Sequence, residues 1–186
     1  MSHASAYDFY HGTDHGERYE FEFKAMQLDE PRPPLSPHML IQEMVPSAFW
    51  VMVSSLMMVR TGRRQGHEAT WDLLLRYDGP TGLAMAKQSD VKRIIEPAGL
   101  ANRRSKQLIT VARQWHMGIR PWPVKDFMGE PVTPDGVGPY VTNAFRLFVH
   151  GETRLAVQDG HLRRFMVWAH ARRRAGLQWR YEYDED

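Results

Sequence analysis

The chain has no cysteine among its 186 residues. This absence excludes disulfide bonds and metal clusters held by thiolates. The chain also has no run of 18 apolar residues, so we expect no membrane-spanning helix and no membrane partner. The first ten residues lack the basic and apolar regions of a signal peptide, so we expect a cytoplasmic or nucleoid protein (nuclear in a eukaryote) rather than a secreted one.

Strand content is also minimal: apolar and polar residues alternate at 19–24, which indicates one short strand. There is no internal repeat, and 42% apolar residues suffice for the core of one domain of this length. The sequence therefore predicts an all-α fold. We expect helices at about 38–44, 48–58, 68–77, 81–85, 102–116, 139–149 and 160–175, and one more ending near Glu96 with Ser89 or Asp90 as its N-cap.

The net charge of +2 conceals an uneven distribution. Residues 1–37 carry seven acids and three bases, residues 38–181 carry 21 bases and 11 acids, and residues 182–186 carry four acids. We therefore divide the chain into an acidic N-terminal extension with a Pro-rich linker (1–37), a basic helical domain (38–181) and an acidic tail (182–186). A basic body fits duplex DNA, although a solvated basic surface is the ordinary alternative.

A tight turn at Gly136-Val137-Gly138 precedes the helix that we expect from Pro139. Glycine allows positive φ and a close approach of the backbone to a ligand, and proline suits a first helical position. The free N–H groups and the dipole of the helix would then favour a bound anion, such as a phosphate. An ordinary helix–helix turn is the alternative, because such short motifs often arise by chance.

A lone carboxylate, Asp159, stands at the start of the last expected helix, 19 residues after Tyr140. Cleavage of a glycosidic bond develops positive charge on the sugar. A fixed carboxylate can stabilise that charge and align or deprotonate water. Aspartate is also a preferred N-cap, and the two roles can coexist.

Three segments in a fixed order resemble motifs of one enzyme family. They read Pro97-Ala98-Gly99-Leu100 with Arg104-Ser105-Lys106, then Gly136-Val137-Gly138-Pro139-Tyr140, then Asp159-Gly160-His161. In this order they are similar to the helix-hairpin-helix, endonuclease III-like, DNA glycosylase superfamily, over about residues 45–175. The resemblance implies a two-lobed helical fold. The absence of cysteine excludes the four-cysteine iron–sulfur cluster of many relatives, and the one bound group the family suggests is a sodium or potassium ion at the hairpin backbone near Gly136 and Gly138.

The resemblance also implies roles for single residues. Asp159 corresponds to the catalytic carboxylate. Contacts with DNA phosphates are expected from Gly136, Val137, Gly138, Tyr140, Arg104, Lys106 and His161. A solvated helix face is the alternative for the two basic residues, and an ordinary helix histidine is the alternative for His161.

Tyr140 bears on the type of reaction. Bifunctional members of the family have a lysine at this position, and its amine attacks the sugar. Tyrosine cannot form a Schiff base, so the resemblance implies a monofunctional enzyme with weak or no lyase activity. It looks like the mismatch-specific thymine/uracil branch, which includes the glycosylase domain of the methyl-CpG-binding-domain thymine glycosylase. We expect Tyr140 in the catalytic base pocket, with packing in the core as the alternative.

Arg60-Thr61 is similar to the "Leu-x-x-Arg-Thr" helix end of the same branch. This likeness implies that Arg60 and Thr61 line the base pocket. Arg60 and Leu100 are then candidates for the wedge that fills the gap left by a flipped base. A cation at a helix C-terminus and a core contact are the respective alternatives. Val59 stands where many relatives have glutamine or asparagine, which leaves the target base open.

Together these features predict a monofunctional DNA glycosylase of base excision repair. We expect a monomer that removes uracil or thymine opposite guanine from double-stranded DNA. A modified pyrimidine such as 5-hydroxymethyluracil, or adenine opposite 8-oxoguanine, is the alternative substrate. Outside enzymes, the alternative is a non-catalytic, structure-specific DNA-binding module.

Overall fold

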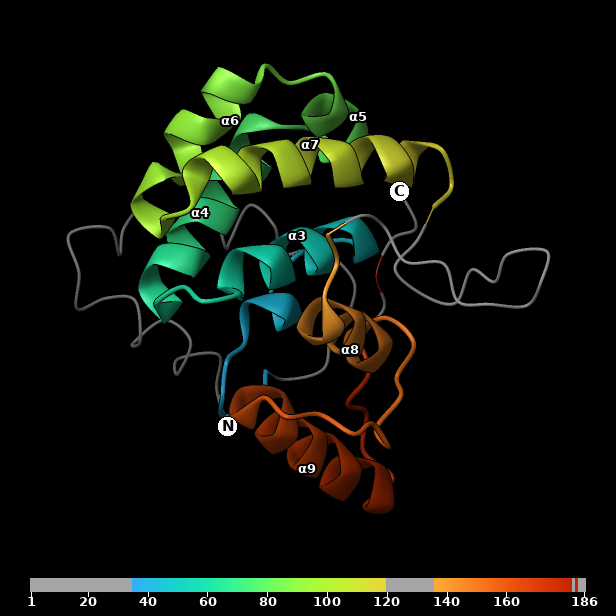
Figure 1. Ribbon diagram of the computed structural model, residues 1–186. Helices are drawn as coiled ribbons and strands as arrows, with labels where there is room; N and C mark the ends of the chain where they lie inside the picture. Colours follow the sequence, from blue (N-terminus) through green and yellow to red (C-terminus); the bar gives the residue numbers. More distant parts are fainter. Residues whose placement is uncertain (1–34, 120–135, 182, 184–186) are drawn as a thin grey trace.

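The computed structural model describes residues 35–119, 136–181 and 183 (Figure 1). These residues form seven α-helices, two 3-10 helices and no strand, so the predicted all-α class is confirmed. The elements are η1 (Ile41–Glu43), α3 (Ala48–Met58), α4 (Arg63–Arg76), α5 (Gly79–Ala84), α6 (Gln88–Ile95), η2 (Glu96–Ala98), α7 (Ala101–His116), α8 (Pro139–Phe148) and α9 (Gly160–Arg174). None of these helices combines the length and apolarity that crossing a membrane requires. The strand expected at 19–24 and most of the Pro-rich linker lie outside the described residues.

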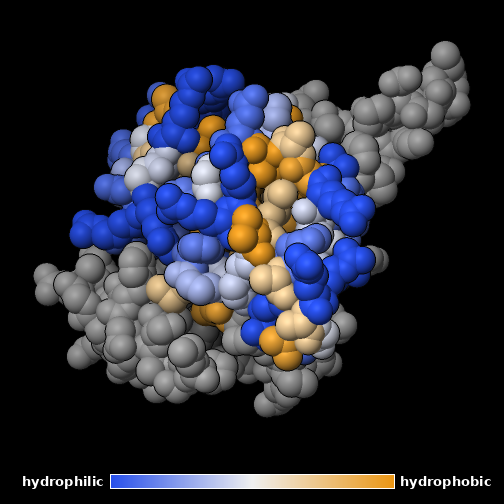
Figure 2. All heavy atoms as spheres, turned by 90° about the horizontal axis from the view of Figure 1, so that it is seen from below, coloured by the Kyte–Doolittle hydropathy of each residue, from blue (hydrophilic) through white to orange (hydrophobic). Residues whose placement is uncertain are grey.

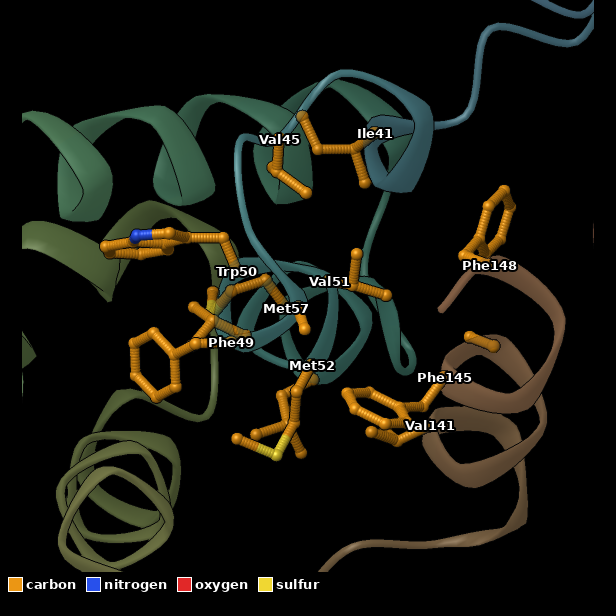
Figure 3. Packing of buried hydrophobic residues seen from close by; sticks show 14 of the residues in the cluster. Ile41, Val45, Phe49, Trp50, Val51, Met52, Met57, Val141, Phe145 and Phe148 are labelled. Carbon is orange, nitrogen blue, oxygen red and sulfur yellow. The ribbon is translucent and has the colours of Figure 1, made fainter. Parts of the chain in front are cut away.

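Helix α3 is the centre of the fold. All of its residues up to Met57 are buried, and a helix that is apolar on every side must be covered on every side. Helices α4 and α7 pack on it from one direction and η1 and α8 from another. Figure 3 shows Val141 and Phe145 of α8 directed at α3, while Phe49 of α3 lies away from α8. Phe49 meets Trp115 of α7 edge-on, with ring centroids 5.4 Å apart.

The helices are arranged in two lobes on either side of α3. Helices α4 to α7 lie together above it in Figure 1, and α8 and α9 lie below it. Helix α9 joins the lower lobe through Phe165, whose ring centroid lies 4.5 Å from that of Phe148. The arrangement agrees with the expected two-lobed fold, and it places the starts of α8 and α9 near the end of α3.

Several element boundaries differ from the predicted ones. Helix α4 begins at Arg63 rather than Glu68. The sequence did not predict its first turn, because that turn is polar and shows no apolar periodicity. Helix α6 begins after Lys87, and no side chain caps it, so the caps predicted at Ser89 or Asp90 were wrong. The helix expected at 38–44 is only the single turn η1, since Met39 has a positive φ of 42°.

Candidate active site

A cavity of about 670 Å³ lies where the ends of several helices meet. Its size is within the range of small-ligand pockets, about 300–1,000 Å³. The wall is formed by η1, the C-terminal end of α3 with the turn that follows it, the start of α4, the start of α8, and residues 156–159 with His161 and Leu162. Five residues predicted from the sequence line this one cavity: Arg60, Thr61, Tyr140, Asp159 and His161.

Asp159 caps helix α9. Its Oδ1 atom accepts hydrogen bonds from the backbone N–H groups of His161 and Leu162, each at 2.9 Å. None of the described residues donates a hydrogen bond to Oδ2. The predicted cap is thus present, and it occupies only one oxygen of the carboxylate. The second oxygen remains for whatever occupies the cavity.

Tyr140 lies in the first turn of α8, half-buried between the core and the cavity. Its hydroxyl oxygen accepts a 3.4 Å hydrogen bond from Nε2 of Gln42. Burial and the negative charge of Asp159 raise the pKa of Tyr140 to about 12, while the Gln42 hydrogen bond opposes the shift. The phenol is therefore neutral near neutral pH and keeps its proton for donation.

Gln42 is a cavity residue that the sequence analysis did not identify. It is 1% exposed, and Nε2 also donates to Oγ of Ser55 at 3.1 Å. A carboxamide carries both donors and acceptors, so Gln42 is suited to contact a polar ligand. A signal was present, since Gln42 and Glu43 are the only polar residues in the run 39–45.

Glu43 fixes the segment that carries Gln42. Its buried carboxylate accepts hydrogen bonds from Ser36, from a backbone N–H and from the Tyr181 hydroxyl at 2.9 Å. Burial raises the pKa of Glu43, and these donors act in the opposite direction. Tyr183 adds a 2.7 Å hydrogen bond to the backbone oxygen of Gln42. The segment after α9 thus holds η1 in place on the cavity wall.

The surroundings of the cavity are positively charged. Burial, followed by the charges of Arg164, His161 and Arg63, lowers the pKa of His38. His67 lines the cavity as a neutral residue, because burial and the charge of Arg63 lower its pKa to about 3. Clustered cations beside a cavity attract anions.

Basic side chains also cover the face of α9. Figure 2 shows hydrophilic side chains on both sides of an apolar strip on this face of the molecule. The exposed arginines of α9 are Arg163, Arg164, Arg173 and Arg174. The side of the molecule that carries the start of α9 therefore suits an anionic polymer.

Of the two glycines in the turn before α8, only one has the positive φ that the sequence predicts. Gly136 has a positive φ of 79°, whereas Gly138 has an ordinary φ of −91° and serves as the N-cap. Gly138 is exposed, and apart from its two chain neighbours no atom of the described residues lies within 4 Å of the position of an added Cβ. Pro139 occupies the start of the helix, as predicted. The N-terminal end of α8 is thus open to a ligand.

The resemblance suggests an alkali cation near the carbonyls of the two hairpin glycines, and both carbonyls accept hydrogen bonds. The Gly136 carbonyl accepts a hydrogen bond from Nε2 of Gln107. The Gly138 carbonyl accepts two from Thr142, at 3.1 and 3.3 Å. Both carbonyls are therefore already engaged by donors. Among the described residues there is also no group of three His, Asp or Glu side chains that could hold a metal ion.

The two wedge candidates lie on neighbouring turns. Arg60 and Leu100 are exposed and have positive φ angles of 54° and 53°. The guanidinium of Arg104 connects the turns, because it donates to the carbonyls of Val59 and Gly99. Arg104 is only 5% exposed, so its position is not that of the phosphate contact expected from the sequence. Lys106 is exposed on α7 and stays a candidate for that role.

Comparison with known proteins gives a partial match to a DNA glycosylase. No protein-family model matches the chain. Over 63 residues the chain is 32% identical to a thymine-DNA glycosylase of Aeropyrum pernix. The matched segment is 34% of this chain and spans 28% of the length of the archaeal protein. The similarity agrees with a DNA glycosylase in general and leaves the branch and the site residues open.

Proposed function

We propose that this chain is a monofunctional DNA glycosylase that removes uracil or thymine opposite guanine from duplex DNA. The observation that carries the proposal is the cavity itself. It brings together a carboxylate, Asp159, one oxygen of which accepts no hydrogen bond from the described residues, a neutral phenol, Tyr140, and a buried carboxamide, Gln42. The partial similarity to a thymine-DNA glycosylase supports the same class of reaction.

DNA binding rests on the hairpin and on the basic surface. The open N-terminal end of α8 offers backbone N–H groups and a positive dipole end to one phosphate. Exposed basic residues such as Lys106 and Arg164 supply attraction that does not depend on sequence. The protein then acts as a monomer on double-stranded DNA.

Base flipping uses the two neighbouring turns. Arg60 and Leu100 enter the stack and fill the gap left by the extruded base. A mismatched pyrimidine is extruded at lower cost than a paired one. Inside the cavity, Gln42, Thr61 and Tyr140 offer hydrogen bonds to the polar edge of the pyrimidine.

The chemical step is hydrolysis of the N-glycosidic bond. As the bond between sugar C1′ and the base nitrogen breaks, its electron pair leaves with the base and the sugar becomes oxocarbenium-like. Asp159 stabilises that charge and accepts a proton from the water that attacks C1′. The departing base takes up a proton from solvent and Asp159 releases the one that it accepted, so one water has been added and the products are the free base and an abasic sugar. Tyr140 provides no amine to form a Schiff base with the sugar, so the DNA strand remains intact. The proposed hydrolysis requires no cofactor.

The test is a single-turnover assay on labelled duplexes that contain U·G, T·G, 5-hydroxymethyluracil·G or A·8-oxoguanine, analysed with and without alkali. We expect strand cleavage only after alkali treatment, on U·G or T·G. Asp159→Asn should bind the duplex and excise the base about 100-fold or more slowly than wild type. The variant needs fresh preparation and an intact-mass check, because an asparagine that precedes Gly160 can deamidate back to aspartate. Tight binding by both proteins without any excision would contradict the enzyme and favour a DNA-binding module.

A further inference from the structure

Three non-glycine residues in the described part of the chain have a left-handed backbone: Met39, Arg60 and Leu100. This conformation places Cβ too close to the following carbonyl oxygen and is therefore strained. Such residues persist only where the surrounding structure holds them. In each of the three turns, an arginine side chain donates to a backbone carbonyl. For Met39 the donor is Arg63, at 2.6 Å.

A single side chain, Arg104, serves the other two turns. Its NH1 atom donates to the carbonyls of Ala98, at 2.7 Å, and Gly99, at 3.1 Å. Its NH2 atom donates to the carbonyl of Val59. Val59 and Gly99 directly precede Arg60 and Leu100. The two strained residues are therefore joined through one guanidinium, although they are 40 positions apart in the sequence.

The chemistry of arginine suits this connection. A guanidinium is rigid and planar and presents its donors in a fixed fork. In this chain three carbonyls occupy that fork, and the side chain is only 5% exposed. Its neighbours Arg103 and Lys106 are exposed on the same helix. Of these three bases, only Arg104 is directed inward, towards both turns.

We propose that Arg104 is a positioning residue that holds Arg60 and Leu100 at a fixed separation, so that both enter the same gap in a duplex. The proposal rests on the proposed function, in which these two residues fill the space of the flipped base. It separates two steps of the reaction. Extrusion of a paired base depends on Arg104, whereas hydrolysis at a base that is already unpaired does not.

Lysine is the informative replacement. An ammonium on a flexible stem keeps the charge and can reach a carbonyl, but it lacks the fork that spans both turns. We therefore compare Arg104→Lys and Arg104→Gln with the matched exposed control Arg103→Gln. Each protein is tested in single-turnover excision of uracil from a U·G duplex and from a single strand. Hydrogen exchange of the backbone amides at 59–62 and 99–102 is measured in the free proteins.

We expect Arg104→Lys to excise uracil from the duplex about 10- to 100-fold more slowly than wild type, as for a small misplacement of positioning groups. Excision from the single strand should change by less than about twofold. Exchange should become faster in both turns at once. Arg103→Gln should match wild type in every measurement. Arg104→Gln should show the larger loss, and Arg104→Lys alone decides the outcome where the Gln variant does not fold.

Equal losses on duplex and single strand would overturn the proposal, as would faster exchange in only one turn. The exchange measurement does not depend on catalysis. If the wild type excises no base, the proposed function fails, yet the coupling of the two turns is still decided. Simultaneous acceleration in Arg104→Lys would support the coupling, and unchanged exchange would sink it.

Discussion

Two parts of the site differ in the state of their backbone. The turns that carry Arg60 and Leu100 have positive φ angles of 54° and 53°, at residues with large side chains. The starts of α8 and α9 have relaxed N-caps, with φ of −91° at Gly138 and −68° at Asp159. The two turns that would penetrate DNA are therefore strained, whereas the two helix starts that would bind phosphate and perform hydrolysis are not; the third left-handed residue, Met39, lies before η1.

The difference follows from what each part must do. A side chain that enters a base stack has to project away from the protein, and a left-handed residue at the tip of a turn achieves this at a cost in stability. A group that stabilises charge must instead keep its orientation, and a helix cap provides that orientation without strain. We consequently expect substitutions in the two parts to change stability in opposite directions. Relief of strain in the turns should raise stability, and loss of a cap at the helix starts should lower it.

The largest effect is expected at Asp159, in a comparison of Asp159→Asn with Asp159→Ala. Both variants should lose about 100-fold or more in excision rate, since both lack the carboxylate. Only the alanine variant should lose about 1 kcal/mol of stability, because asparagine still caps α9. Single-turnover kinetics and urea unfolding measure the two quantities. An active asparagine variant would contradict the catalytic role of Asp159 and leave it only the role of the N-cap of α9.

The two hairpin glycines should behave differently. Gly136→Ala should cost about 1–2 kcal/mol, since φ is 79° and the new Cβ would lie 2.9 Å from Nε2 of Gln107. Gly138→Ala should cost less than Gly136→Ala, because its φ is ordinary and the space is open, so that only the poorer N-cap preference of alanine remains. It should still weaken duplex binding about tenfold, the equivalent of one charge-assisted hydrogen bond. Urea unfolding and binding titrations at constant salt measure the two quantities. Undiminished DNA binding by Gly138→Ala would contradict the proposed phosphate contact at the start of α8.

A pH effect is expected from His67, on the cavity wall that both parts share. Its pKa is about 3 in the folded state, against 6.5 for an unperturbed histidine such as that of the unfolded chain. Between these values the unfolded chain binds a proton that the folded chain does not. Stability is therefore complete above pH 6.5 and falls as the pH drops towards 3, by at most about 1.4 kcal/mol per pH unit.

Urea unfolding between pH 7 and 5 measures this slope. His67→Gln should show a flatter dependence than wild type, whatever its stability at pH 7. The exposed His116 supplies the matched control, and His116→Gln should keep the wild-type slope. Equal slopes in all three proteins would show that His67 is hydrated.

The smallest effect is expected at Leu100. Glycine tolerates positive φ and alanine does not, so Leu100→Gly should be about 1 kcal/mol more stable than Leu100→Ala. Both variants lack the side chain that enters the duplex, and both should excise more slowly from a mismatch than from a single strand. Thermal unfolding beside the two-substrate assay would test this, and an alanine variant as stable as the glycine variant would argue against strain.

The sequence was a good guide to the helices and to one end of the site. The apolar run 48–58 predicted the bounds of α3 that the structure has. Asp159 before Gly160 predicted a helix cap, which the structure confirms. These features depend on neighbouring residues in the chain, and local patterns report them directly.

The parts that were missed depend on contacts between distant residues. Gln42 and Tyr140 are 98 positions apart, and nothing local to either residue indicates the other. The positive φ of Leu100 has no signature in a non-glycine residue. For Arg104 a signal existed, since its spacing to Leu108, Val111 and Trp115 places it on the buried face of α7. Its positive charge, by contrast, favours an exposed position.

The cap on α9 also has an evolutionary consequence. One side chain, Asp159, supplies both the first turn of a helix and the proposed carboxylate. Most replacements would remove both at once, so drift away from catalysis is coupled to a loss of stability. Asparagine, serine and threonine are the exceptions, because they preserve a cap without a charge. A descendant that had become a pure DNA binder would be expected to carry one of these three residues at position 159.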